Sequence, residues 1–366
     1  MRPDHDSEVQ RELVLAVRRY WAGPLYEAVV NRARQVVLST ADPLAGARQL
    51  ERELAGDTAY QAFGWLEHHL QVEKYTGPRG LLAAGARLAP AVVAELDRAA
   101  TVHPERLDLA PEVVAPEYYT ATDFHLVPGG IHSRPYDGVV YEWAAGSTTM
   151  MGNEAVEVHD GLAAHIATLA PARVLDVGCG FGRTVLALAK VLPGATIAGC
   201  DLSEPALRLA PRHAVTNGAT IELARARAED LARYPDNSFD VVTATMLVHE
   251  MPPESVRAFL RAARRVLAPG GRLVVLDFYL VPGGAIGLLF HLGHARRNGE
   301  PFMTALLDLD LPAELTAAGF EGIGISSFPS GSDPDHVPKR WRLPWTLLQA
   351  TASPTVEPNG GGLRAP

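Results

Sequence analysis

The residues with the clearest chemical meaning are three glycines at alternate positions, Gly178, Gly180 and Gly182, preceded by the acidic residue Asp176. They lie between a short apolar run, typical of a buried strand, and a stretch with helical periodicity. Glycines at such a turn allow a ligand to lie against bare backbone at the N-terminus of the helix. A dinucleotide pyrophosphate gains nothing from a neighbouring carboxylate, whereas a cationic ligand does. The pattern therefore indicates a site for a small molecule that carries positive charge.

A second acidic residue, Asp201, ends the next predicted strand, over residues 197–201. In nucleotide-binding α/β folds, an acidic residue at this place accepts hydrogen bonds from both ribose hydroxyls. A carboxylate can accept both bonds at once. We therefore expect the cationic ligand to carry a ribose.

The spacing D-x-G-x-G-x-G resembles the first motif of class I S-adenosylmethionine (SAM) methyltransferases. Four later segments, 197–203, 226–231, 236–245 and 267–277, resemble further motifs of that family in the same order. SAM carries a sulfonium and an ammonium group, which agrees with the charge argument. The chain is most similar to the ubiquinone/menaquinone-biosynthesis subgroup, whose members methylate small molecules. The resemblance implies an α/β fold with a seven-stranded Rossmann-like sheet, and SAM as the cofactor.

The resemblance also implies which residues hold SAM, at the carboxyl ends of the parallel strands. The segment 226–231 would face the adenine, although Arg227 stands where many relatives have an Asp. The predicted cofactor-binding residues are Asp176, Gly178, Cys179, Gly180, Gly182, Asp201, Leu202, Ala228, Glu229, Thr245 and Met246.

Three histidines are candidates for catalysis. Methyl transfer from a sulfonium needs a base only when the acceptor is protonated at the working pH. His249 follows the fourth predicted strand, and it either acts as the base or packs beneath the cofactor. His125 and His132 flank a Pro-Gly-Gly turn among aromatic residues, in a segment that is either a lid over the site or a linker between domains. We predict no metal site, because a third convincing ligand is lacking.

Other residues are candidates for holding the acceptor. Tyr141 and Trp143 belong to the aromatic segment, and His291 and His294 share the spacing of one helix face. Arg296 or Arg297 could bind an acidic acceptor, although surface exposure is the commoner role of such residues.

The periodicity of the apolar residues divides the chain into a helical N-terminal part and a part in which strands and helices alternate. Apolar residues recur at helical spacing over 9–21, 24–38, 43–54, 59–73 and 81–99. From Arg173 onward strand and helix patterns alternate, which requires a parallel sheet. We predict an N-terminal helical domain over 1–110, a lid or linker over 111–155, a SAM-binding methyltransferase domain over 156–351 and a disordered tail over 352–366.

The composition narrows the function further. The chain has 366 residues, a net charge of −9 and two cysteines. No basic patch with interleaved aromatic residues is present, so we expect no nucleic-acid partner. We also expect no membrane partner, reduced thiols, a cytoplasmic location and a possible homodimer.

The sequence thus favours SAM-dependent methyl transfer to a bacterial small molecule in secondary or cofactor metabolism, with O-methylation ahead of C- or N-methylation. Two alternatives stay open. The chain could be an enzyme with the same fold and a non-methylating reaction, or a non-catalytic SAM-binding regulator.

Overall fold

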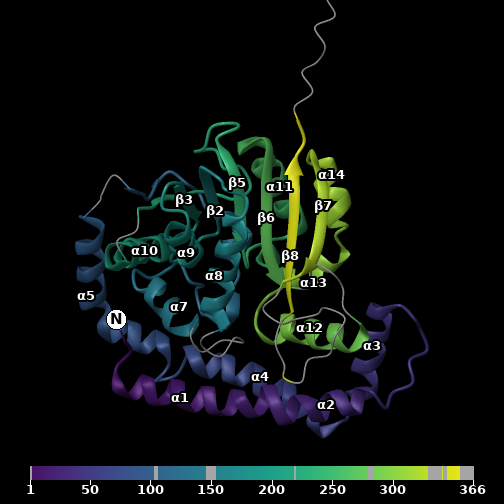
Figure 1. The fold of residues 1–366 in the computed structure, drawn as a ribbon. Coiled ribbons are helices and arrows are strands. Elements are labelled where there is room, and N and C mark those ends of the chain that lie inside the picture. The colour runs from purple at the N-terminus through teal and green to yellow at the C-terminus, as the bar shows by residue number, and fades with distance from the viewer. Residues whose placement is uncertain are drawn as a thin grey trace, which may run out of the picture.

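The structure is a computed structural model that describes residues 2–102, 106–145, 154–217, 220–278, 284–328, 340 and 344–354. An eight-stranded sheet crosses the molecule in the order β1-β4-β3-β2-β5-β6-β8-β7 (Figure 1). The strands are β1 (Leu107–Asp108), β2 (Arg173–Val177), β3 (Thr196–Asp201), β4 (Glu222–Arg225), β5 (Phe239–Thr245), β6 (Leu267–Phe278), β7 (Phe320–Ser327) and β8 (Trp345–Ala352). All neighbouring pairs are parallel except the two that involve β8.

The predicted Rossmann-like α/β sheet is confirmed, and its strand count is corrected from seven to eight. The added strand, β1, pairs in parallel with β4 at the edge of the sheet, where Leu107 lies opposite Leu223. It falls within the predicted N-terminal helical domain, 1–110, but after the last stretch of helical periodicity, which ends at residue 99. A strand of two residues is too short for an alternating pattern to show in the sequence.

Both faces of the sheet are covered by helices, which explains the continuous apolar runs in its strands. Successive residues of β2 point to opposite faces. Val174 packs in a cluster with α8 (Glu154–Ala167) and α9 (Arg183–Val191). Leu175 packs in a second cluster with α11 (Pro253–Val266).

The N-terminal helices lie at the end of the sheet toward which the parallel strands run (Figure 1). They are α1 (His5–Tyr20), α2 (Tyr26–Ala33), α3 (Pro43–Leu54), α4 (Thr58–Tyr75) and α5 (Leu81–Ala100). Trp21 stacks on Phe63 at 4.9 Å between ring centroids, and Phe63 contacts Phe290 of α12 (Ala285–Arg297) at 5.2 Å. These contacts join the N-terminal helices to the same hydrophobic cluster as the sheet.

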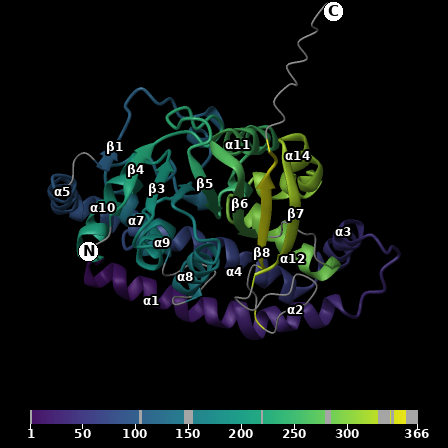
Figure 2. The ribbon, with the colours of Figure 1, turned by 45° about the horizontal axis from the view of Figure 1, so that its top comes forward.

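The expected break before Pro24 is absent. A π-helical segment, Trp21–Leu25, links α1 to α2, so that the two form one long rod across the base of the molecule (Figure 2). Pro24 lacks a backbone N–H, and the wider turn accommodates it without ending the helix.

The remaining helices connect the strands or precede the sheet. They are α6 (Glu117–Thr120), α7 (Asp137–Ala145), α10 (Glu204–Asn217), α13 (Phe302–Ala305), α14 (Leu311–Ala317) and the 3-10 turns Phe124–Leu126, Val248–Glu250 and Leu306–Asp308. Within the described ranges, no helix is both long and apolar enough to cross a membrane. Residues 355–366 of the predicted tail and 146–153 of the predicted lid lie outside the described residues.

Candidate active site

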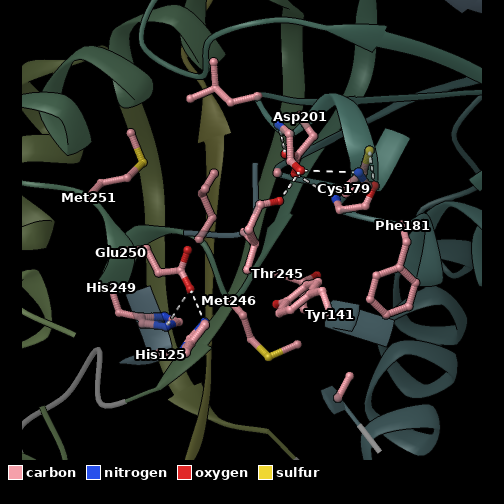
Figure 3. Close-up of a pocket in the computed structure, with 18 of the residues that line it drawn as sticks. His125, Tyr141, Cys179, Phe181, Asp201, Thr245, Met246, His249, Glu250 and Met251 are labelled. Atoms are coloured by element: carbon pink, nitrogen blue, oxygen red, sulfur yellow. Dashed lines mark hydrogen bonds and ion pairs between the residues drawn. The ribbon is translucent and has the colours of Figure 1, made fainter. Parts of the chain in front are cut away.

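A cavity opens where the carboxyl ends of β2, β3 and β5 meet the N-terminal helices. Figure 3 shows Asp201 and Cys179 at one end, and His125, His249 and Glu250 at the other, with Tyr141 and Met246 between them. We call these the cofactor end and the acceptor end. The acceptor end also includes Arg18, Gln71, Tyr75, His294, Asn298 and Glu300.

The glycine turn at the cofactor end is held by backbone and carboxylate bonds. The N–H of Gly178 donates to the carbonyl of Cys200 at 2.8 Å. The N–H of Gly180 donates to one oxygen of Asp201 at 2.8 Å, and the N–H of Ser203 donates to the other at 2.7 Å. Each carboxylate oxygen of Asp201 retains a second lone pair for a ligand hydroxyl.

All three glycines have positive φ, but their surroundings require the absence of a side chain for different reasons. A Cβ on Gly178 would lie 2.9 Å from Leu247, and one on Gly182 would lie 3.0 Å from Ala210. A Cβ on Gly180 would meet no heavy atom closer than Tyr141 at 4.0 Å. Gly178 and Gly182 are therefore required by packing, whereas Gly180 leaves space over the turn for a ligand.

The charges at the cofactor end favour a cation. Asp176 is 1% exposed, and neither of its oxygens has a hydrogen-bond partner among the described residues. Burial, with the neighbouring charge of Asp201, raises the pKa of Asp176 well above its usual value. Burial also raises the pKa of Asp201. A positively charged ligand nearby would stabilise both carboxylates in their ionised form.

The residues present fit SAM. The Asp201 carboxylate can take the ribose hydroxyls, and the open backbone at Gly180 admits the ligand. Glu229 lines the cavity and accepts a hydrogen bond from the Tyr118 hydroxyl at 2.9 Å, while its second oxygen has no hydrogen-bond partner in the described part of the chain. Most of the predicted cofactor residues line the cavity: Gly178, Cys179, Gly180, Asp201, Leu202, Ala228, Glu229, Thr245 and Met246. Asp176 and Gly182 lie behind this lining.

A histidine–aspartate pair lies at the acceptor end. His249 follows β5, and its Nδ1 lies 2.6 Å from an oxygen of Asp277 on β6. Burial opposes protonation of His249, but the charge and hydrogen bond of Asp277 outweigh it and raise its pKa to about 9. The other ring nitrogen, Nε2, lies 4.0 Å from Glu250, beyond hydrogen-bond distance. His249 can therefore exchange a proton with a group in the cavity through Nε2.

His125 lines the same end but is bound on both sides. Its Nε2 lies 2.9 Å from Glu250 and its Nδ1 lies 3.2 Å from Glu300. Burial acts against the charge, but the hydrogen bonds and charges of the two glutamates raise the pKa of His125 to about 10. His125 is thus held as an imidazolium with both ring nitrogens engaged by carboxylates, so it has no free nitrogen with which to act as a base. Its backbone lies in the left-handed region (φ 57°), as does that of Met246 (φ 55°), so both residues are held in a strained conformation at the cavity.

Two predicted residues of the aromatic segment are not brought to the cavity. His132 does not line the cavity; its ring packs against Tyr119 at 4.8 Å. Trp143 is buried in the cluster of α5, α7 and α10, whereas Tyr141 lines the cavity. Two residues along a helix correspond to roughly 200°, so Tyr141 and Trp143 must point to nearly opposite sides.

The two histidines of α12 also differ in whether they line the cavity. His294 lines the cavity, and its Nδ1 lies 2.7 Å from Glu67. Burial disfavours the protonated ring, but Glu300 and Glu67 outweigh this effect and raise the pKa of His294 to about 9. His291 does not line the cavity; its Nε2 lies 3.3 Å from the carbonyl of Met303, and burial lowers its pKa to about 3.

Neither candidate arginine of the α12 C-terminus lines the cavity. Arg296 pairs with Glu51 and Arg297 pairs with Glu67. Both arginines therefore bind acids of the N-terminal helices.

Several residues of the acceptor end were missed by sequence reasoning. Glu250, Glu300 and Arg18 are brought to the cavity from distant segments. Gln71 and Tyr75 belong to α4, where polar residues recur every three or four positions on the buried face. That buried polar stripe was the one available signal, because a stripe of this kind is unusual in a helix that packs against a core.

The fold and the site agree with the predicted class I, SAM-dependent methyltransferase domain. Residues 174–271 match the protein family described as "Methyltransferase domain". This stretch contains the glycine turn, Asp201 and the strands that carry them.

Two curated relatives are similar to this part of the chain. Demethylmenaquinone methyltransferase from Thermus thermophilus is 39% identical over 138 residues, which cover 38% of this chain and 60% of the relative. Ubiquinone biosynthesis O-methyltransferase from Pseudomonas syringae pv. tomato is 44% identical over 108 residues, which cover 29% of this chain and 44% of the relative. The chain thus spans about half the length of these relatives.

Solved structures with similarity to the chain include SAM-dependent methyltransferases. One from Methanosarcina mazei is 20% identical, with a TM-score of 0.37, and covers 50% of this chain and 92% of its own. An arsenic(III) SAM methyltransferase from Chlamydomonas reinhardtii is 22% identical, with a TM-score of 0.37, and covers 50% of this chain and 63% of its own.

Proposed function

We propose that this protein transfers a methyl group from SAM to a hydroxyl oxygen of a small molecule in bacterial cofactor or secondary metabolism. The observation that carries the proposal is the buried His249–Asp277 pair, which lies in the same cavity as the glycine turn and Asp201. The name of the Pseudomonas relative, an O-methyltransferase, supports the choice of oxygen.

The residues of the cofactor end would hold SAM. Asp201 would accept the ribose hydroxyls, Glu229 and Ala228 would face the nucleoside, and Asp176 would favour the positive charge. When bound, SAM supplies a methyl group that its sulfonium already activates for displacement. The aromatic side chains of the cavity exclude water, and the enclosed space restricts the acceptor to a productive orientation.

His249 is the base in this proposal. Asp277 fixes the ring through Nδ1, and in the neutral ring, which predominates above the pKa of about 9, Nε2 can take the proton from the acceptor hydroxyl. A hydroxyl acceptor needs this step because it is protonated at neutral pH, whereas a carboxylate acceptor would not need it. His125 keeps its proton between Glu250 and Glu300, and it positions the acceptor instead of deprotonating it.

The test is incubation with SAM labelled with deuterium in its methyl group and a panel of phenols, alcohols, carboxylic acids and amines. We expect a labelled product from a hydroxyl compound, with the methyl group on oxygen by NMR. A converted but unlabelled product would favour a non-methylating enzyme. Tight SAM binding without conversion of any compound would favour a regulator. Either result would contradict the proposal.

A further inference from the structure

One face of α4 carries buried polar residues along the acceptor end of the cavity. Glu67, Gln71, Lys74 and Tyr75 follow one another at spacings of four, three and one along the helix, and each is at most 5% exposed. Such residues are seldom buried unless they are paired. The question is which of them have partners.

Two of the four are satisfied within the protein. Glu67 binds His294 and Arg297. Gln71 accepts a hydrogen bond from Nη2 of Arg18 at 2.7 Å and donates one to the carbonyl of His125 at 3.1 Å. Gln71 therefore connects Arg18 to the residue that lies between Glu250 and Glu300.

Three hydrogen-bond donors in this region, one each on Arg18, Lys74 and Tyr75, are left without a partner among the described residues. Nε of Arg18, Nζ of Lys74 and the hydroxyl of Tyr75 are closed to water and have no hydrogen-bond partner among the residues that the structure describes. Nζ of Lys74 lies 4.5 Å from the centroid of the Tyr75 ring. Arg18 is 4% exposed and Lys74 is 2% exposed. A buried guanidinium and a buried lysine nitrogen thus share one small region with an unused hydroxyl donor.

The charges of Glu67 and Glu300 act on Arg18 and Lys74 respectively, but burial outweighs them. Glu67 is bound by His294 and Arg297, and Glu300 lies between His125 and His294. Burial, together with the charge of Arg18, lowers the pKa of Lys74 well below its usual value. Burial likewise lowers the pKa of Arg18 to about 10. An anion placed here would be strongly favoured, because it would supply the missing counter-charge in a region of low dielectric.

We propose that the methyl acceptor carries a carboxylate, which binds at Arg18 and Tyr75 with the side-chain nitrogen of Lys74 behind them, where the anion would favour its protonated form. This inference rests on the proposed function, because it concerns the acceptor of the same site. Arg18 and Tyr75 line the cavity, so an acidic group that enters it lies beside these two side chains and reaches Nε and the hydroxyl once the side chains that close them off from water shift. A carboxylate has two oxygens for the two lining donors, whereas a phosphate would leave a third oxygen without one.

The cavity wall also indicates the rest of the acceptor. Tyr118, Tyr119, Tyr141, Phe181 and Phe278 line it. Aromatic side chains of this number favour a flat aromatic ring by offset or edge-to-face packing. The acceptor class is therefore an aromatic carboxylic acid that also carries a hydroxyl group.

The test compares benzoate with benzamide, which have the same ring and nearly the same shape but differ in charge. Each is titrated by NMR into the full-length protein, with and without S-adenosylhomocysteine, and inorganic phosphate is a third probe. We expect benzoate to bind about tenfold more tightly than benzamide or phosphate, since only benzoate supplies a planar anion.

Variants connect this preference to the three donors. Arg18→Met should remove the preference for benzoate and leave the affinity for benzamide unchanged. Tyr75→Phe, which deletes one hydroxyl, should weaken benzoate binding by about threefold to tenfold. The exposed residues Arg19 and Lys190 provide matched controls, Arg19→Met and Lys190→Met, which should leave the preference intact.

Lys74→Met separates a binding role from a structural one. It should reduce the preference for benzoate but raise the melting temperature by a few degrees, because it removes a buried nitrogen that has no hydrogen-bond partner among the described residues. If Lys74 served only to stabilise the fold, Lys74→Met would lower the melting temperature.

The inference is overturned if benzoate and benzamide bind equally to the wild type, if phosphate binds more tightly than benzoate, or if Arg18→Met and Tyr75→Phe both keep the preference. Its failure is distinct from that of the proposed function. A protein that binds S-adenosylhomocysteine and methylates a neutral hydroxyl compound would contradict the carboxylate and retain methyl transfer. A protein that selects benzoate but does not bind S-adenosylhomocysteine would retain the carboxylate site and contradict methyl transfer.

Discussion

Nδ1 of His249 lies 2.6 Å from Oδ1 of Asp277, and the pair joins the end of β5 to its neighbour β6 in a fully buried position. The second oxygen of Asp277 accepts the backbone N–H of Val248 at 2.9 Å. The carboxylate therefore fixes both the ring and the turn that presents it. The orientation of Nε2 toward the cavity follows from this arrangement.

The first prediction concerns His249 as the base. His249→Ala should lower kcat by roughly 10²–10⁴ while SAM affinity stays near the wild-type value. Steady-state kinetics and calorimetry measure the two effects. The exposed His69→Ala variant is the matched control and should keep full activity. Near-normal turnover of His249→Ala would contradict the assignment and leave orientation of the acceptor as the main source of catalysis.

The second prediction is the pH dependence of that step. Asp277 raises the pKa of His249 to about 9, so the ring carries a proton below that pH and cannot accept another. The rate should therefore increase with pH up to about 9. Asp277→Asn removes the charge that raises the pKa, and its rate profile should shift to lower pH, with a lower maximum because the ring is less well oriented. An unshifted profile would show that another group controls the rate.

The third prediction concerns stability and His125. Its pKa is about 10 in the folded protein and near 6.5 when the chain is unfolded. The stabilisation from its charge is therefore complete below pH 6.5 and is lost as the pH rises toward 10. Melting temperatures between pH 6.5 and 10 should fall by several degrees more in the wild type than in His125→Gln, which cannot titrate. Parallel curves would contradict the charged state of His125.

The parts of the fold and of the site that the sequence predicted are those encoded by short local motifs. The apolar strands, the glycine turn and Asp201 are short continuous motifs, and the parallel sheet brings their carboxyl ends together. The cofactor end of the cavity was accordingly predicted almost residue by residue, although its role in binding SAM stays a prediction. Asp176 and Gly182 fall behind the lining because one lies within a strand and the other starts a helix.

The acceptor end could not be predicted in the same way. His125 and Glu300 are 175 positions apart and meet only in the folded chain, so no local pattern in the sequence reveals the contact. His132 lies away from the cavity because the backbone between it and His125 turns through residues of positive φ, which redirects the chain. The proposed division at residues 110, 155 and 351, the cytoplasmic location and the homodimer stay predictions.

The fourth prediction concerns the ribose contact of Asp201. Asp201→Ala should weaken SAM binding by roughly 1.5–3 kcal/mol, since charge-assisted hydrogen bonds are lost. Part of the loss would come from the freed N–H groups of Gly180 and Ser203. Calorimetry measures the affinity, and Asp236→Asn, at an exposed site paired with Arg265, is the control. Unchanged affinity in a folded Asp201→Ala variant would exclude this residue from the cofactor site.

The last prediction separates the glycine that admits the ligand from one that packs the fold. Gly180 and Gly182 both have positive φ, 52° and 90°, so alanine at either position costs about 1–2 kcal/mol of backbone strain. At Gly182 the new Cβ would also lie 3.0 Å from Ala210, so Gly182→Ala should lower the melting temperature further. At Gly180 the Cβ has room within the protein and would fill the space over the turn.

Gly180→Ala should therefore weaken SAM binding by about tenfold or more with the smaller loss of melting temperature, because the methyl group occupies the place where the ligand meets the backbone. Calorimetry and thermal unfolding on the two variants provide both measurements. If Gly180→Ala bound SAM as tightly as the wild type, the ligand would have to lie elsewhere in the cavity, and the open space above Gly180 would have no role in binding.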